Sequence, residues 1–199
     1  MEQETPIEEL NRLWQPVRPY LARQIGELYG RRDGHVLEIG PFSGLLFDLA
    51  GNGVGRSFSI AAFPKAAFRS CQEEARRLGL EERVRITESN ASLSGIAADS
   101  VDLAIFRGAL FFPSLFRTDF GAIDRTLRPG GVAFIGGGFG RYTPAEVIER
   151  IGKRSEELNL AMGRVRISME DARKQAESSL LRGTFEITTD GGLWVTLRK

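Results

Sequence analysis

Residues 36–44, with the sequence VLEIGPFSG, carry the groups of this chain that are best suited to bind a ligand. An apolar strand ends on the carboxylate of Glu38, and Gly40 and Gly44 bound the turn that follows. Glycines let a ligand approach the main chain because they have no side chain. The G-x-G-x-x-G fingerprint of dinucleotide binding is absent, and a carboxylate would repel a pyrophosphate but attract an ammonium group. The pattern therefore favours a cationic ligand.

Composition excludes several other kinds of chemistry. The 199 residues are 42% hydrophobic and 27% charged, which suits one sizeable core, and the net charge of +1 gives no bias toward nucleic acid. Cys71 is the only cysteine, so neither a disulfide framework nor a thiolate metal cluster is expected. No stretch reaches the ~18 apolar residues of a membrane span, and the acidic start does not resemble a signal peptide. We expect a cytoplasmic protein without metal, nucleic-acid or membrane partners.

The elements that must position Glu38 alternate between strands and helices. Pro and Gly residues mark most of their ends, and FEITTDGGLWVTLRK at residues 185–199 is typical of a β-hairpin with a tight turn. Strands are expected at 35–40, 56–62, 84–89, 101–108 and 130–138, and helices after Pro19, from 43, at 64–79, after Pro113, from 143 and at 168–183.

This alternation predicts an α/β fold: a Rossmann-like, doubly wound, mostly parallel seven-stranded sheet with a C-terminal antiparallel hairpin. Residues 1–199 are expected to form a single domain, with a leading helical segment at 1–30 and a helical cap at 139–183. In such sheets ligands bind beyond the carboxyl ends of the strands, where the strand order reverses. The first strand borders that point, so the turn after Glu38 lies where a ligand is expected.

The helix expected at 64–79 is amphipathic and should pack against the sheet. Its apolar face holds Phe68, Cys71, Ala75 and Leu78, and its outward face holds Glu73, Glu74, Arg76 and Arg77. Elsewhere the quartet RVRI occurs twice, at 83–86 and 164–167, which is too short to indicate a repeat.

Three stretches share the order and spacing of one enzyme family: VLEIGPFSG at 36–44, VDLAIF at 101–106 and LRPGGVAFI at 127–135. In these stretches, over about half its length, the chain resembles class I S-adenosylmethionine-dependent methyltransferases. The resemblance implies that S-adenosyl-L-methionine is the cofactor and that Glu38 helps to hold its methionine part. The cofactor contacts that the resemblance implies are Glu38, Gly40, Pro41, Phe42, Gly44, Ala61, Asn90, Ala91 and Phe106.

The chain departs from the family pattern at three of these positions. Phe42 stands where the family has its middle glycine, so its ring must line the pocket or fill it. Ala61 stands where an acidic residue usually receives the ribose hydroxyls; losing charge-assisted hydrogen bonds there would weaken binding by roughly ten- to a thousandfold if nothing replaced them. Asn90 replaces a common Asp, but its carbonyl can still accept from the adenine amine.

The resemblance implies in-line methyl transfer to a small-molecule acceptor, without an identified catalytic residue. The acceptor pocket is expected between the leading helix and residues 138–183, with Arg107 and Phe111 on the acceptor side. His35 is the only histidine and precedes a buried strand, so we expect it to be structural. The absence of a second histidine disfavours the methylation of phenols that relies on a histidine. Trp14, Tyr20 and Trp194 are either core residues or contact residues, and the second case would give a homodimer.

Two alternatives stay open from the sequence. Phe42 and Ala61 are also what an inactive protein of this fold would show, one that acts as a binding or regulatory partner. Loss of the ribose acid near Lys65 could instead admit a phosphate and hence a different nucleotide. Glu38 argues against that second alternative electrostatically.

Overall fold

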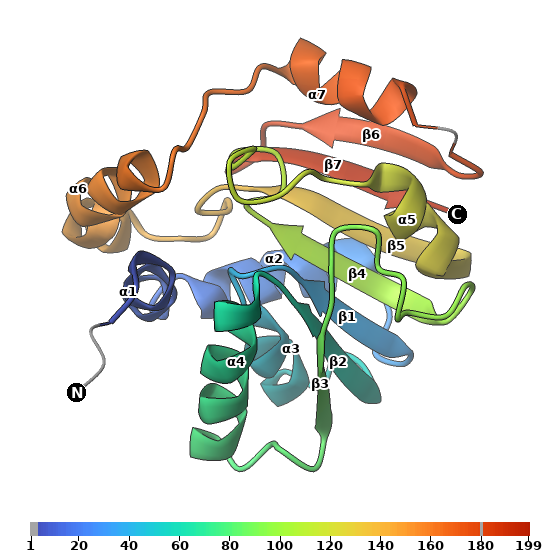
Figure 1. The fold of residues 1–199 in the computed structure, drawn as a ribbon, viewed down its shortest axis with the longest axis horizontal. Coiled ribbons are helices and arrows are strands. Elements are labelled where there is room, and N and C mark those ends of the chain that lie inside the picture. Colours follow the sequence, from blue (N-terminus) through green and yellow to red (C-terminus); the bar gives the residue numbers. More distant parts are fainter. Residues whose placement is uncertain (1–3, 180) are drawn as a thin grey trace.

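Seven strands form one sheet in the order β3-β2-β1-β4-β5-β7-β6 in the computed structural model, which describes residues 4–179 and 181–199 (Figure 1). β1 to β5 pair in parallel, whereas β7 is antiparallel to both β5 and β6. This is the fold that the sequence predicts. The strands are β1 (His35–Ile39), β2 (Ser57–Ala62), β3 (Val84–Glu88), β4 (Val101–Arg107), β5 (Leu127–Gly137), β6 (Thr184–Thr188) and β7 (Leu193–Arg198).

Helices cover both faces of this sheet. Buried residues of α2, α3 and α4 share one apolar cluster with one face, and those of α5 and α7 share a second cluster with the other face. The helices are α1 (Pro6–Leu13), α2 (Arg18–Tyr29), α3 (Leu45–Gly51), α4 (Lys65–Arg77), α5 (Phe120–Thr126), α6 (Ala145–Ala161) and α7 (Met169–Glu177). None of the described helices is both long and apolar enough to cross a membrane.

The strand order reverses between β1 and β4, which are direct neighbours in the sheet. Side chains alternate between the two faces along a strand. Leu37, Ile39 and Phe106 therefore belong to the cluster under α5 and α7, whereas Glu38 lies on the face that carries α3. The loops that follow β1 and β4 meet at this reversal, which is where a ligand is expected.

The N-terminal segment contains two helices where the sequence predicts one after Pro19. The missed helix α1 begins with a capping box, in which Thr5 and Glu8 each bind the backbone N–H of the other. The sequence TPIEE carries this signal, because Thr three residues before Glu is the usual pattern and Pro6 suits the first helical position.

Three other helix boundaries differ from the prediction. α5 begins at Phe120 rather than just after Pro113, and its N-cap is the carboxylate of Asp119. α7 begins at the expected capping box but ends at Glu177, before Gly183. Leu78 is the C-cap of α4 and is exposed, so it does not share the apolar face assigned to it.

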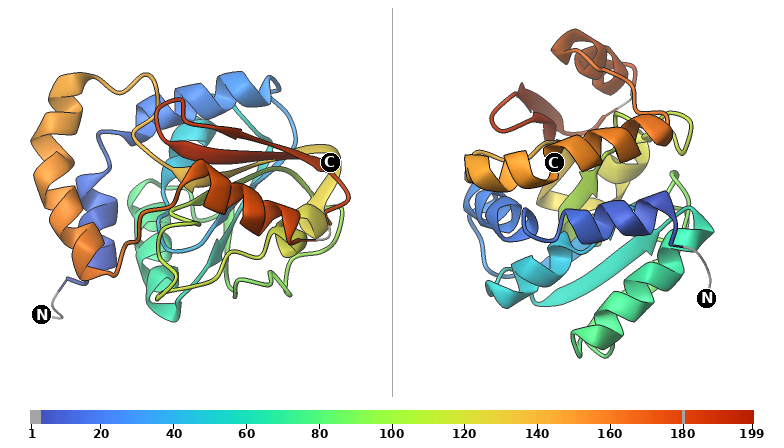
Figure 2. Two further views of the ribbon diagram at one scale, coloured as in Figure 1. Left: turned by 90° about the horizontal axis from the view of Figure 1, so that it is seen from above. Right: turned by 90° about the vertical axis from the view of Figure 1, so that its left-hand side faces the viewer.

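α1 and α6 pack against each other at the carboxyl ends of the strands (Figures 1 and 2). Trp14, just after α1, joins this layer to the segment after β5, since its ring stacks on Phe139 with 4.8 Å between the ring centroids. Its indole N–H also donates to Oγ of Ser155 on α6 at 2.8 Å. These contacts hold the leading segment and α6 together beside the ends of β4 and β5.

Candidate functional site

Glu38 closes the N-terminus of α3. Its carboxylate accepts hydrogen bonds from the backbone N–H of Gly44 at 2.9 Å and from those of Leu45 and Leu46, each at 3.2 Å. These are N–H groups that a helix leaves without an internal partner, and a negative charge there is also favoured by the helix dipole. Burial raises the pKa of Glu38, while Arg107 and these N–H groups act in the opposite direction. Glu38 therefore has a structural role that the sequence analysis did not assign.

A buried ion network covers the other end of the same loop. Nη1 of Arg18 lies 2.7 Å from Oε1 of Glu74, and its Nε lies 3.4 Å from Oδ2 of Asp48. A Cβ placed on Gly44 would lie 1.8 Å from Nη1 of Arg18, so the glycine is needed for the guanidinium to fit. The prediction that Glu74 faces outward is wrong, because this network draws it toward Arg18 and leaves its side chain only 14% exposed.

Aromatic rings fill the space on the other face of β1. Phe106 lies against Gly40, since a Cβ on that glycine would be 2.6 Å from Cε2 of the ring. The Phe106 ring centroid is 5.7 Å from that of Phe63 and 5.2 Å from that of Phe116. Ala61 is fully buried in the same cluster. These rings therefore fill the space around Ala61, the position at which the sequence analysis expects the ribose.

The remaining predicted contacts lie in different surroundings. Pro41 is buried, and its carbonyl accepts from Nδ2 of Asn11 in α1 at 2.8 Å. Asn90 is exposed, and its side chain bonds to the hydroxyls of Ser92 and Ser94 in its own loop. Ala91 is half-buried beside it. The structure therefore brings the loop 40–44, Ala61 and Phe106 together, whereas Asn90 lies at the surface.

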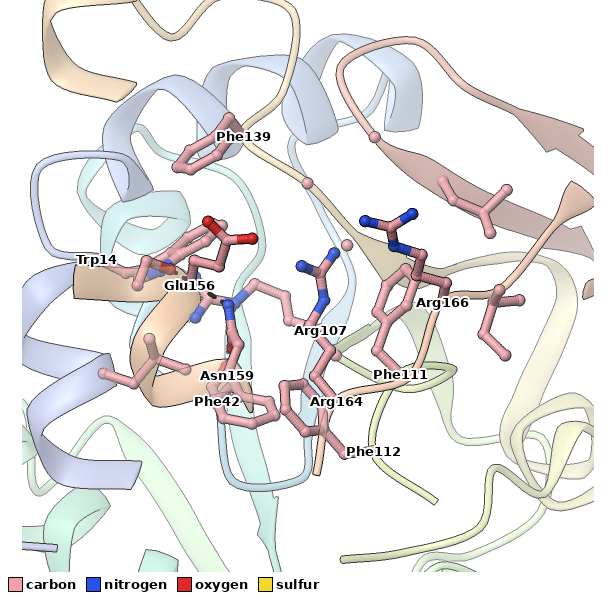
Figure 3. Close-up of a pocket in the computed structure, with 18 of the residues that line it drawn as sticks. Trp14, Phe42, Arg107, Phe111, Phe112, Phe139, Glu156, Asn159, Arg164 and Arg166 are labelled. Carbon is pink, nitrogen blue, oxygen red and sulfur yellow. Dashed lines mark hydrogen bonds between the residues drawn. The ribbon is translucent and has the colours of Figure 1, made fainter. Parts of the chain in front are cut away.

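A cavity of about 660 Å³ opens beside this loop, between α1, α6 and the carboxyl ends of β4 and β5 (Figure 3). Phe42 is the only predicted cofactor contact among the residues that line it. Its ring packs against that of Phe112 with 4.8 Å between centroids and an angle of 45° between the ring planes, and it also packs on Gly108, where a Cβ would approach it to 2.4 Å. Phe42 is thus both part of the core and a wall of the cavity.

Arg107 places a positive charge in the wall of the cavity. Its side chain is buried, its Nε donates to the carbonyl of Phe42 at 3.1 Å, and its guanidinium carbon lies 5.6 Å from the centroid of the Trp14 ring. Burial lowers the pKa of Arg107 to about 10, and nearby Glu38 acts in the opposite direction. The guanidinium is therefore still charged at neutral pH.

Two more arginines reach the cavity from the segment between α6 and α7. Arg164 and Arg166 flank Val165, whose N–H donates to the carbonyl of Phe111 at 2.8 Å. The guanidinium of Arg164 also lies 5.4 Å from the centroid of the Phe111 ring. The hydrogen bond holds both arginines beside the loop that follows β4.

The lining includes residues that the sequence analysis did not single out as binding residues. Glu156 and Asn159 come from α6, and Phe139 follows β5. Arg164 and Arg166 belong to the second RVRI quartet, which is too short to indicate a repeat. The available signal was their two charges between two predicted helices. Among the described residues, no group of acidic, histidine and cysteine side chains could hold a metal ion.

No model of a known protein family matches the sequence, and no curated protein matches it either. Solved structures do match. A proposed S-adenosyl-L-methionine-dependent methyltransferase from Methanococcus maripaludis aligns with a TM-score of 0.77 and 22% identity, over 100% of this chain and 95% of that chain. A methyltransferase from Aquifex aeolicus aligns with a TM-score of 0.65 and 14% identity, over 98% of both chains. This chain has the class I methyltransferase fold.

A third structure with this class I methyltransferase fold contains bound ligands. It is the geranyl diphosphate C-methyltransferase of Streptomyces coelicolor, crystallised with Mg²⁺, geranyl diphosphate and S-adenosyl-L-homocysteine. It aligns with a TM-score of 0.58 and 14% identity, over 89% of this chain and 78% of that chain. At such identities the likeness establishes the fold.

In this arrangement the protein's own side chains cover the loop after β1, where S-adenosyl-L-methionine, the cofactor of this fold, is expected to bind. Both carboxylate oxygens of Glu38 accept N–H groups of α3, and residues 40–44 are all buried under the protein's own side chains. The ring of Phe106 covers Gly40, and the guanidinium of Arg18 covers Gly44. A cofactor that contacts Gly40 and Gly44 on these sides would have to displace both side chains.

Proposed function

We propose that this chain is an S-adenosyl-L-methionine-dependent methyltransferase whose small-molecule acceptor lies in the cavity. The observation that carries the proposal is the position of the cavity, which adjoins the loop after β1 at the carboxyl ends of β4 and β5. Ligands of doubly wound sheets bind at this edge, where the strand order reverses. The solved structures that share the fold are described as methyltransferases, which supports the same reading.

The chain's own residues would bind and orient the acceptor and exclude water from it. Aromatic walls provide a dry surface, and binding in a fixed orientation is the main contribution an enzyme makes when the transferred group is already activated. His35 lies at the amino end of β1, at the opposite edge of the sheet, and burial raises the pKa of Cys71 to about 12. Neither residue is available as a base or nucleophile, so the proposal favours acceptors that need no prior loss of a proton.

A second candidate function is favoured by the covered loop. In this alternative the protein keeps the methyltransferase fold but acts only by binding a small molecule in the cavity, as a regulatory or carrier protein. Phe106 over Gly40 and Arg18 over Gly44 support it, because both side chains occupy surfaces that a cofactor would need.

Calorimetric titration with S-adenosyl-L-methionine and S-adenosyl-L-homocysteine separates the two candidates. Binding of either compound at micromolar concentration, followed by methylation of a member of a small-acceptor panel, supports the enzyme. Absence of binding at millimolar concentration in a folded sample refutes the enzyme and leaves the binding protein. Glu38→Ala is a poor test of cofactor contact, because this substitution also removes the cap of α3. The same proposal includes a homodimer and a cytoplasmic location. Light scattering of the purified chain tests whether it forms a homodimer.

A further inference from the structure

We propose that the cavity binds a small molecule with two parts: an oxyanion, carboxylate or phosphate, held by Arg107, Arg164 and Arg166, and a flat apolar body held by the aromatic walls. The inference rests on the proposed function in so far as it names the chemical class of the acceptor. It applies equally to a protein that only binds this ligand, because it concerns the cavity alone.

Arg107 is a buried cation whose own surroundings satisfy it incompletely. Its Nη1 is buried and has no hydrogen-bond partner among the described residues. Glu38 is close enough to affect its pKa, yet the two side chains form no ion pair within 4.0 Å. A buried charge without hydrogen-bonded partners is costly, and an oxyanion can accept from a guanidinium through two parallel bonds. Arg107 is therefore the central anchor of the proposed site.

Arg164 and Arg166 add positive charge that no acidic side chain neutralises. Among the described contacts Arg164 has its ring contact with Phe111, and neither arginine forms a salt bridge. Both are exposed at the side of the cavity that the backbone bond of Val165 fixes. The guanidinium groups of Arg107, Arg164 and Arg166 thus line one cavity, against the single carboxylate of Glu156.

The apolar part of the ligand is set by rings from three different segments. Trp14 follows α1, Phe42 lies in the loop after β1, and Phe111 and Phe112 lie in the loop after β4. Figure 3 shows these rings and the three arginines around the same space. The volume of about 660 Å³ is within the ~300–1,000 Å³ range of small-molecule pockets and accommodates a two-ring aromatic compound.

A cationic ligand would suit the aromatic walls but not the charges. Aromatic rings attract ammonium groups, whereas each nearby guanidinium repels them. With three guanidinium groups and one carboxylate in the lining, the net field favours an anion. The sequence analysis inferred a cationic ligand from the charge of Glu38. That inference does not apply to the cavity, because the carboxylate of Glu38 faces α3 rather than the cavity.

The test compares three probes with the same ring system: 2-naphthoate, 2-naphthyl phosphate and the neutral 2-naphthamide. Each is titrated calorimetrically into the full chain at low ionic strength and again at high ionic strength. We expect at least one of the two anions to bind roughly tenfold or more tightly than the amide, because a charge-assisted hydrogen bond exceeds a neutral one by about that factor. We also expect the difference to shrink as salt rises. The preferred anion distinguishes a carboxylate from a phosphate ligand.

Substitutions then assign the effect to the cavity. Arg107→Gln should abolish the preference for anions, and the exposed pair Arg164→Gln with Arg166→Gln should reduce it by roughly three- to tenfold. The double variant keeps the test valid if Arg107→Gln does not fold, because exposed side chains contribute little to folding. Arg150→Gln, an exposed arginine of α6 outside the lining, is the matched control and should change nothing.

Equal binding of naphthoate, naphthyl phosphate and naphthamide, or an equal loss in the Arg150→Gln control, would overturn the inference. Titration with S-adenosyl-L-methionine in the same samples keeps this outcome separate from the fate of the proposed function. Preference for anions without cofactor binding refutes the methyltransferase but not the anion site. Cofactor binding without a preference for anions refutes the anion site but not the methyltransferase.

Discussion

Replacing Phe106 by alanine tests whether a cofactor must displace an aromatic ring before it can bind. The ring is 1% exposed, lies over Gly40 and packs against Phe63 and Phe116. If S-adenosyl-L-methionine contacts Gly40 on the side that the ring occupies, the ring must leave this position and lose much of its burial. The native chain would then bind the cofactor more weakly than a chain without the ring.

Burial of a phenylalanine side chain provides the magnitude of this effect. Exposing it costs about 1.5–3 kcal/mol, which makes the dissociation constant of the cofactor roughly 10- to 150-fold larger. Phe106→Ala removes that cost, so we expect S-adenosyl-L-homocysteine to bind tighter by this factor. The same substitution should lower the free energy of unfolding by about 3–5 kcal/mol, because it leaves a cavity in the core.

The assay is calorimetric titration at low temperature, with circular dichroism to establish that each variant is folded. Phe120→Ala is the matched control, since Phe120 is also 1% exposed and belongs to the same apolar cluster. It should lose similar stability without a gain in affinity. Equal affinity of the native chain and folded Phe106→Ala would refute the reasoning, as would an equal gain in Phe120→Ala.

Three further predictions follow from the groups around the loop. Glu38→Gln should lower the free energy of unfolding by about 1–3 kcal/mol in chemical denaturation, because an amide group faces N–H donors of α3; exposed Glu73→Gln should change it little. Cys71 should react with a thiol reagent at pH 8 only when the protein opens, since burial raises its pKa to about 12; labelling as fast as in denaturant would contradict this. Burial lowers the pKa of His35, so the unfolded chain takes up the proton first and the free energy of unfolding should fall as pH drops below about 6.5. His35→Gln should lack this part of the pH dependence, and an unchanged slope would exclude His35 as its source.

Local patterns in the sequence were sufficient to predict the fold. Turn residues and the alternation of strand and helix patterns depend on neighbours in the chain, so they predicted the doubly wound sheet and its closing hairpin. The same kind of signal, in TPIEE, marks helix α1 and was available although it was not used. Phe42 and Ala61 were also recognised from the sequence as departures from the family pattern.

Only the tertiary structure decided what the charged and aromatic groups of the candidate site do. Glu38 has the type and position of a cofactor contact, but its oxygens bind the first turn of α3. Glu74 faces an arginine from another helix, and Arg164 joins Arg107 although 57 positions separate them in the sequence. The physical reason is that a buried charge or ring is stabilised by whichever groups the packing brings within a few ångströms. Those groups come from distant segments, and no local periodicity records their distances.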